Sequence, residues 1–365
     1  MKRNLWTALA LMIVIAMVLP ACGGKEGTSK TDEPYKLAFV YIGPPGDLGW
    51  TYEHDRARKV LEEHFGDKIE TTYIENVEEG PDAARVIRQY AQEDYDMIFA
   101  TSFGYMDYMY EVAQEFPDVK FEHCSGSKSL DNMANCFGRI YQARYLSGIV
   151  AGKMTTNGNI GYVAAFPIPE VIRGINAFTL GVRSVNPDAK ITVVWTNTWY
   201  DPVKEREAAV ALLDAGADII AQHQDTTEPQ KAAQERGMLS IGYDSDMRAF
   251  VGDSVLTSPM WNWSVYYIET VQAAMNGKWT THSYWEGLNE NVVRLADYSA
   301  KVPQDVRDSV EAAKKEIIEN DQIFCGPLKD QAGNEVVAAG QCLSDGDKLG
   351  MMFFVEGVEG TIPTE

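Results

Sequence analysis

The sequence predicts an α/β protein with two similar lobes, each built on a parallel β-sheet that helices cover on both faces. Short apolar runs alternate with helical patterns along most of the chain. The strand-like runs are apolar throughout, which is typical of strands buried on both faces. The alternation stops at a polar segment, residues 124–133, and restarts at Asn159, which indicates a second lobe.

The first run of alternating elements extends from residue 37 to residue 123. Its predicted strands are 37–42, 69–74, 96–100 and 119–123, and its helices are 51–64, 80–92 and 105–116. A strand and a helix follow within residues 136–151. The second run has strands at 160–164, 191–195, 218–221 and 239–242, and helices at 171–185, 204–215 and 229–237. Later predicted elements are strand material at 255–258 and 282–285, helices at 264–276 and 303–320, and a hairpin after Cys325.

The chain length and these two runs define the expected lobes. We expect an N-terminal lobe of residues 35–140 and 255–285, and a C-terminal lobe of residues 141–254 and 286–365. Roughly 340 residues remain after the leader, enough for two domains of ordinary size. Interlobe strands would act as a hinge.

The first residues have the features of a secretory leader. Two basic residues precede an apolar run, residues 9–19, which is shorter than the ~20 residues that a membrane span needs. The run ends in Leu-Pro-Ala before Cys22, and this resembles the bacterial lipoprotein cleavage pattern. That resemblance implies a signal peptide of residues 1–21, a lipid such as palmitate on Cys22, and a polar tether of residues 22–34. The alternative is an uncleaved anchor. We expect an exported lipoprotein that faces the periplasm or the cell exterior.

Four cysteines remain beyond Cys22, and an even number in an exported protein favours two disulfides. The pairing that closes short loops joins Cys124 to Cys136 and Cys325 to Cys342. Metal binding is the competing use, but the sequence has neither CxxC nor HxxxH spacing. We therefore expect disulfides and no metal site.

The charge of the chain excludes some classes of partner. The formal net charge is −21, and loss of Lys2 and Arg3 with the leader makes it −23. A surface this acidic repels nucleic acid and anionic membranes, so the lipid would be the only membrane contact. The sequence has no P-loop, GxSxG, HExxH or GxGxxG after a strand, and we expect neither an enzyme nor a cofactor. We expect a monomer.

Aromatic and acidic side chains follow the predicted strands. In open α/β sheets, ligands bind at the carboxyl ends of the strands. Two lobes with such loops facing each other would form a cleft for a small molecule. The residues that we place in it are Asp47, Trp50, Thr51, Phe103, Gly104 and Asp107 from the first half, and Trp199, Asp244 and Trp261 from the second.

Trp50 and Trp199 occupy similar loop positions in the two lobes and could sandwich a flat ring. Stacking on an aromatic side chain contributes ~1–3 kcal/mol per base in nucleic-acid binders. Asp107 and Asp244 would accept charge-assisted hydrogen bonds from ring or exocyclic N–H groups. The alternative for each tryptophan is packing in the core, and for Asp47 it is capping of the following helix.

Several blocks of sequence, in their order and spacing, carry a resemblance to a known family. The blocks are GDLGWTYEHDRAR, SFGYMDYMYEVAQEFPDVKF, YQARYLSGIVAG, NIGYVA, WYDPVKEREAA, LLDAGADII, IGYDSDM and VLTSPMWNWSVYY. The chain resembles the basic membrane protein family of substrate-binding lipoproteins, which serve ABC importers. This resemblance covers nearly all of the mature chain. It implies the type I periplasmic-binding-protein fold and an ABC permease as partner.

The resemblance also implies a ligand, because characterised members bind purine nucleosides. The two aromatic residues that sandwich the base fall on Trp50 and Trp199, the acidic residue that reads the base falls on Asp107, and the aspartate associated with ribose falls on Asp244. Two departures matter: Trp50–Thr51 replaces a Phe-Asn pair, and the segment with Trp261 replaces a common lysine. The loss of that lysine and the added bulk favour a free nucleobase such as adenine over a nucleoside.

Other functions remain open at this point. Purine nucleoside binding is the first alternative. A nucleoside hydrolase would use Asp244 and Asp246 as acids, although the sequence has no metal cluster to support it. A ligand sensor for a signalling receptor would use the same pocket. Sugars and amino acids also remain open as ligand classes, because aromatic side chains stack on sugars too.

Overall fold

The computed structural model describes residues 33–363. The predicted signal peptide, the lipid site at Cys22 and nearly all of the tether lie outside the described residues. The chain from Tyr35 onward forms one compact unit. Among the described residues, we find no helix with the length and apolar character that a membrane crossing requires.

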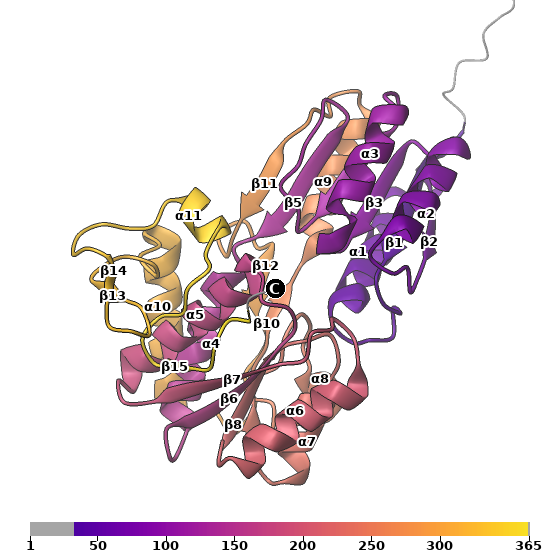
Figure 1. Cartoon of the computed structure of the whole chain (residues 1–365). Coiled ribbons are helices and arrows are strands. Elements are labelled where there is room, and N and C mark those ends of the chain that lie inside the picture. Colours follow the sequence, from indigo (N-terminus) through magenta and orange to yellow (C-terminus); the bar gives the residue numbers. More distant parts are fainter. Residues whose placement is uncertain (1–32, 364–365) are drawn as a thin grey trace, which may run out of the picture. The chain divides into compact units, whose positions relative to one another are not determined.

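The N-terminal lobe is a six-stranded parallel sheet with helices on both faces (Figure 1). Its strands, in the order β11-β5-β4-β3-β1-β2, are β1 (Tyr35–Tyr41), β2 (Ile69–Ile74), β3 (Met97–Thr101), β4 (Lys120–Cys124), β5 (Met133–Gly138) and β11 (Ser283–Glu286). Its helices are α1 (Trp50–Phe65), α2 (Pro81–Gln92), α3 (Met106–Glu115) and α9 (Trp263–Met275), with short 3₁₀ turns η1 (Gly66–Lys68) and η2 (Phe103–Tyr105). Because alternate residues of a strand point to opposite faces, Phe39 packs in one core cluster and Val40 in another.

The C-terminal lobe repeats this plan with a five-stranded parallel sheet in the order β15-β7-β6-β8-β9. Its strands are β6 (Asn159–Ala164), β7 (Lys190–Trp195), β8 (Ile219–His223), β9 (Leu239–Ser240) and β15 (Val358–Glu359). Its helices are α4 (Ile140–Met154), α5 (Pro169–Val185), α6 (Pro202–Asp214), α7 (Glu228–Glu235), α8 (Arg248–Val251) and α10 (Gln304–Glu319). Helices α4 and α5 approach closely because Gly148 and Gly181 lack side chains. A Cβ on Gly181 would lie 2.0 Å from the backbone oxygen of Tyr145.

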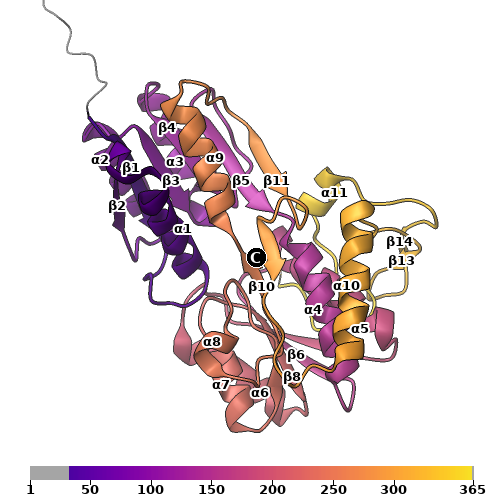
Figure 2. The same cartoon turned by 180° about the vertical axis from the view of Figure 1, so that it is seen from behind.

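The chain passes between the lobes three times. It crosses at Arg139, between β5 and α4, and then at the short strand β10 (Pro259–Trp261), which leads to α9. It returns after β11 through β12 (Val293–Leu295), which pairs antiparallel with β10. Both views show β10 between the two sheets, and Figure 1 also labels β12 there (Figures 1 and 2). These segments form the hinge region.

The C-terminal tail contains β13 (Leu328–Lys329), β14 (Glu335–Val337) and α11 (Asp345–Leu349). β13 and β14 pair antiparallel, and the structure joins Cys325 to Cys342 by a disulfide. The tail then returns to the C-terminal sheet as the edge strand β15. It is therefore part of the C-terminal lobe.

The predicted fold class is confirmed, with two parallel-sheet lobes joined by a hinge. The expected strand at residues 255–258 is reduced to an isolated bridge between Ser240 and Val255. The residue limits proposed for the lobes stay a prediction, although β11 and β15 join the sheets to which we assigned them.

The predicted disulfide between Cys124 and Cys136 is absent from the structure, and both cysteines are free and buried. They lie directly opposite each other on the neighbouring strands β4 and β5, and their Sγ atoms are 2.7 Å apart. The disulfide at this place stays a prediction, because the two sulfurs are neighbours on paired strands. The two thiols fill space between the strands and α9, where burial raises the pKa of Cys136 well above its ordinary value.

Candidate functional site

A cavity lies at the carboxyl ends of both sheets. It is narrow and partly open to solvent. The lining residues are Ile42, Trp50, Ser102, Phe103, Ser125, Glu170, Trp199, His223, Asp225, Tyr243 and Asp244. Trp50, Phe103, Trp199 and Asp244 are among the residues that the sequence predicts for the site. The structure brings these four together from loops far apart in the chain.

Trp50 forms one wall and also belongs to the core. It is the first residue of α1, and its Nε1 donates to the backbone oxygen of Thr101 at 2.7 Å. Its ring packs edge-on against Trp261 and Trp263, with ring centroids 5.7 Å away in each case. These contacts hold the indole in one orientation. Replacement of Trp50 would therefore cost stability as well as any ligand contact.

Trp199 forms a second wall, in the loop between β7 and α6. Its ring packs against Phe166 at 5.0 Å and lies 6.5 Å from His223, between centroids. Its buried Nε1 has no hydrogen-bond partner within residues 33–363. The side chain is only partly buried, so Trp199 is held less firmly than Trp50.

Two buried aspartates supply acceptors. Asp244 is fully buried, and one oxygen, Oδ1, accepts from Trp261 Nε1 at 2.8 Å. In the described part of the chain, neither Oδ2 of Asp244 nor Oδ2 of Asp225 has a hydrogen-bond partner. Burial raises the pKa of both carboxyl groups well above their ordinary value, and the nearby charge of Asp47 raises both further. Such groups are suited to N–H or O–H donors of a ligand.

Glu170, His223 and Tyr243 form a polar cluster beside the aspartates. His223 Nε2 lies 3.3 Å from Glu170 Oε1 and 3.4 Å from the Tyr243 hydroxyl. Burial raises the pKa of Glu170 to about 7 and lowers that of His223 well below its ordinary value. Arg144 lies behind them, with its guanidinium 3.5 Å from the centroid of the Tyr243 ring. The histidine is therefore a neutral lining group, with its buried Nδ1 unpartnered among the described residues.

Backbone conformation sets this site apart from the rest of the fold. Four residues other than glycine have a positive φ in the loops that face the cavity: Leu48, Ser125, Asn197 and Asp244. This left-handed conformation is uncommon outside glycine and is enriched at ligand sites. At Asp244, φ is 64°, and the adjoining bridge to Met260 fixes the carboxylate position.

The lobes touch along one edge of the cavity. Ser245 Oγ donates to the Leu48 oxygen, and a Cβ built on Gly49 would lie 2.2 Å from the backbone oxygen of Asp225. On the same edge, Tyr52 of α1 meets Phe250 of α8 with ring centroids 5.7 Å apart. Since these pairs join α1 and its loop to the C-terminal lobe, the structure represents a closed cleft at this edge.

The structure places the other predicted site residues outside the cavity lining. Asp47 is buried and accepts at 2.9 Å from the N–H groups of Gly49, Thr51 and Tyr52, so it caps α1. Thr51 is fully buried beneath the same loop. The Gly104 N–H donates to Glu79 Oε1 at 2.7 Å, next to Phe103.

Asp107 and Trp261 also need correction. Asp107 is on the outer face of α3, exposed, and its carboxylate pairs with Lys128 at 2.7 Å. Asp107 is not among the residues that line the cavity, so in this structure it does not contact a base there. Trp261 is fully buried and holds Asp244 from behind through its indole N–H. It is a positioning residue in this structure.

The buried acids give the ligand-free protein an expected dependence on pH. Glu170 and Glu205 have pKa values raised to about 7 by burial, well above those of exposed glutamates. The folded protein therefore binds more protons than the unfolded chain, and stability is lost as the pH rises through 7. Burial lowers the pKa of His223. This histidine therefore opposes the loss of stability with rising pH mainly below its ordinary pKa of ~6.5.

We expect the thermal midpoint of ligand-free protein to fall between about pH 6.5 and about pH 8. Calorimetry would measure it. Glu170→Gln should flatten the dependence, whereas Glu207→Gln, at an exposed position on α6, should leave it unchanged. A midpoint that rises over this interval would contradict the assignment of these acids.

Sequence reasoning missed Glu170, Asp225 and Tyr243 as lining residues. Glu170 follows Pro169 in the first turn of α5. A proline followed by an acidic residue is common at helix starts, so this position gave no sign of a binding role. Asp225 follows β8 and Tyr243 follows β9, and neither was assigned to the cavity. Within the described ranges, no three metal-ligating side chains lie close enough together to hold a metal ion.

A closed cleft between two parallel-sheet lobes, lined by aromatics and by acceptors that no described group satisfies, is the arrangement of a solute-binding protein. Comparison with known proteins gives the family. The profile described as ABC transporter substrate-binding protein PnrA-like, Bmp, matches residues 35–325, and the chain belongs to this family. Members of the family are extracytoplasmic, bind small ligands and work with the permease subunits of ABC importers.

Individual relatives support this assignment. The chain is 46% identical over 338 residues to a purine-binding protein of Brucella abortus, covering 92% of this chain and 96% of the relative. It is 43% identical over 339 residues to a putative ABC transporter glucose-binding protein of Haloferax volcanii, covering 93% and 84%. An ABC transporter solute-binding protein of Aeropyrum pernix superposes with a TM-score of 0.70 at 18% identity, covering 81% and 93% of the chains. This last likeness shows the fold alone.

Proposed function

We propose that this protein binds a purine, with a free base such as adenine preferred over a nucleoside, and delivers it to an ABC importer. The observation that carries the proposal is the cavity between Trp50 and Trp199, with unsatisfied acceptors on Asp225 and Asp244. Two aromatic walls suit a flat ring, and carboxylates suit the exocyclic and ring N–H groups of adenine. The 46% identity to a purine-binding protein favours the same ligand class.

The preference for a free base rests on Trp261. Trp261 fills the volume behind Asp244 and uses one of its oxygens, so a single oxygen remains for the ligand. A ribose would therefore find few partners at this end.

Several parts of the proposed role concern residues or partners outside the structure. We place the protein on the membrane through a lipid at Cys22, with the tether leading to Tyr35. Ligand contacts from both lobes would favour the closed cleft, and the closed form would engage the permease. A receptor that uses the same pocket as a sensor is the alternative, and permease and ATPase genes beside the coding sequence would favour transport.

Isothermal titration tests the proposal. Adenine should bind ligand-free protein more tightly than adenosine, and glucose should bind weakest. Trp199→Ala should lower adenine affinity by about 5- to 150-fold, which corresponds to ~1–3 kcal/mol of stacking. The thermal midpoint without ligand should change little, because Trp199 is only partly buried.

Trp195→Ala is the matched control. Trp195 lies four residues earlier, stacks on Phe354 and donates to the Thr361 oxygen outside the cavity. Its loss should leave adenine affinity nearly unchanged. Tighter binding of adenosine would overturn the preference for a free base, and binding of glucose alone would overturn the purine assignment.

A further inference from the structure

A second compartment adjoins the cavity and stays open to solvent while the opposite edge of the cleft is shut. It shares Phe103, Ser125 and Glu170 with the first cavity and encloses about 1040 Å³, including solvent at its mouth. Its other walls come from both lobes and from Leu349 of the tail. A ligand held in the first cavity could extend a substituent into this space.

The polar groups of this compartment are mainly donors, in contrast to the acceptors around Asp244. Arg173 and Asn135 line it and are 2% and 6% exposed. Asn135 Nδ2 and Trp285 Nε1 are buried and have no hydrogen-bond partner in the part of the chain that the structure describes. Unsatisfied buried donors are costly and indicate an absent acceptor. Glu170 is the carboxyl group that faces this space, and it lies on the border with the first cavity.

Arg173 is held rigidly by the tail. Its Nη1 donates to the Lys348 backbone oxygen at 2.8 Å, and its guanidinium lies 4.9 Å from the centroid of the Trp285 ring. These contacts use one of its nitrogens and one face. The remaining N–H groups of the guanidinium are available for a ligand.

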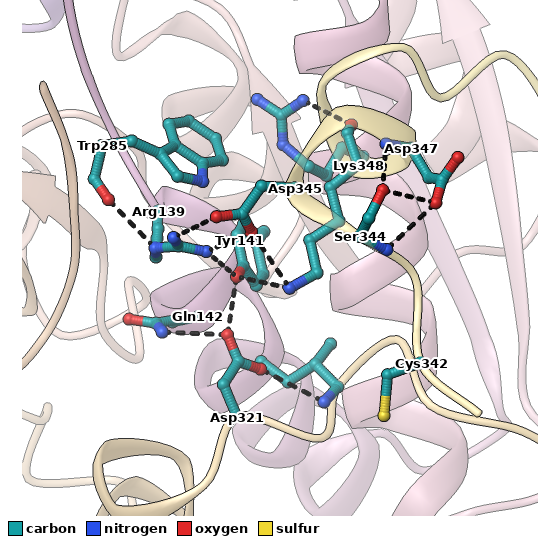
Figure 3. Close-up of polar contacts among 12 residues, drawn as sticks. Arg139, Tyr141, Gln142, Trp285, Asp321, Cys342, Ser344, Asp345, Asp347 and Lys348 are labelled. Carbon is teal, nitrogen blue, oxygen red and sulfur yellow. Dashed lines mark hydrogen bonds and ion pairs between the residues drawn. The ribbon is translucent and has the colours of Figure 1, made fainter. Parts of the chain in front are cut away.

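The tail segment that carries Lys348 is itself anchored at the hinge (Figure 3). Asp345 accepts two hydrogen bonds from the Arg139 guanidinium at 2.7 and 2.6 Å, where the chain crosses between lobes. Ser344 and Asp347 form a capping box at the start of α11. This anchoring fixes the carbonyl that orients Arg173. The family match ends at residue 325, so the tail supplies this feature from outside the matched region.

We propose that the second compartment is a subsite for a negatively charged, oxygen-rich substituent on the bound purine, with Arg173 as the residue that sets this specificity. A phosphate or a carboxylate would accept from the N–H groups of Arg173 that Lys348 does not use. Charge-assisted hydrogen bonds of this kind overcome the long-range repulsion from an acidic protein because they act at contact distance. The inference rests on the proposed purine site.

Titration of wild-type protein with adenine, adenosine and adenosine 5′-monophosphate tests the subsite. The monophosphate should bind about tenfold or more tightly than adenosine, the effect of one hydrogen bond to a charged group. Arg173→Gln should remove this advantage and leave adenine affinity within about threefold. Arg173→Lys keeps the charge and should retain part of the advantage. Arg183→Gln, on the same helix but paired with Glu356 at the surface, should change neither ratio.

The outcomes separate the two proposals. Adenine binding without any advantage of the monophosphate over adenosine would overturn the subsite and leave the purine site standing. Equal losses for adenine and monophosphate in both Arg173 variants would also overturn it, because Arg173 would then act only through the fold. Failure of all three purines to bind wild-type protein would overturn the proposed function itself.

Discussion

Gly49→Ala is expected to reduce purine affinity about 100-fold or more, equivalent to about 3 kcal/mol. A Cβ at this position would lie 2.2 Å from the Asp225 backbone oxygen across the closed edge of the cleft. A backbone atom cannot move aside as a side chain does, so the lobes could not close fully. Since ligand contacts both lobes only when they are shut, the variant should bind mainly through one lobe.

The fold should survive this change. Opening of the cleft relieves the clash, but Gly49 has φ of −123° and ψ of −120°, outside the β and αR regions that an alanine prefers. The free energy of unfolding without ligand should therefore fall by ~1–3 kcal/mol, the cost of one residue held in a sparsely populated region. Gly46→Ala is the matched control in the same loop, because the structure shows no described atom within 4 Å of its added Cβ. Wild-type affinity in Gly49→Ala would show that closure at this edge does not contribute to binding.

Asp244→Asn is expected to weaken adenine binding about 10- to 150-fold, the range for one charge-assisted hydrogen bond. Oδ1 is already used by Trp261, so the ligand must use Oδ2. Asparagine would place an N–H group where Oδ2 stood. That group would face the N–H donor of the ligand, and no hydrogen bond could form between them. The same substitution removes a buried charge and should raise the thermal midpoint of the ligand-free protein at about pH 8.

Lower affinity together with higher stability is expected when a residue serves binding at the expense of the stability of the ligand-free protein. Titration and calorimetry on the same preparations would measure both. Asp246→Asn is the control, because Asp246 follows two residues later and pairs with Arg248 outside the cavity lining. Reduced stability together with unchanged affinity in Asp244→Asn would assign Asp244 to the structure of the loop alone.

The alternating pattern of strands and helices was predictable because each long element carries its own periodicity. Strands β1, β3 and β8 are buried on both faces and read as apolar runs. The short elements were not predictable, since β10, β12 and β15 each have three residues or fewer and exist through tertiary pairing. The tail helix α11 depends on its capping box and its ion pair to Arg139.

Only part of the candidate site could be predicted. Trp50 and Trp199 were found because loops after parallel strands meet at one edge of a sheet. Asp107 was misplaced because position in a loop does not reveal which way a helical side chain points, and α3 buries Met109 and Val112 instead. Arg173 carries no local signal, since its contact with Lys348 joins segments 175 residues apart.

A crystal structure of the adenine complex tests the central claim most directly. We predict the base between the indoles of Trp50 and Trp199, with an N–H group donating to Asp244 Oδ2 and with the Leu48–Ser245 edge closed. Adenine bound elsewhere, or in this cavity without contact to either tryptophan, would contradict the account.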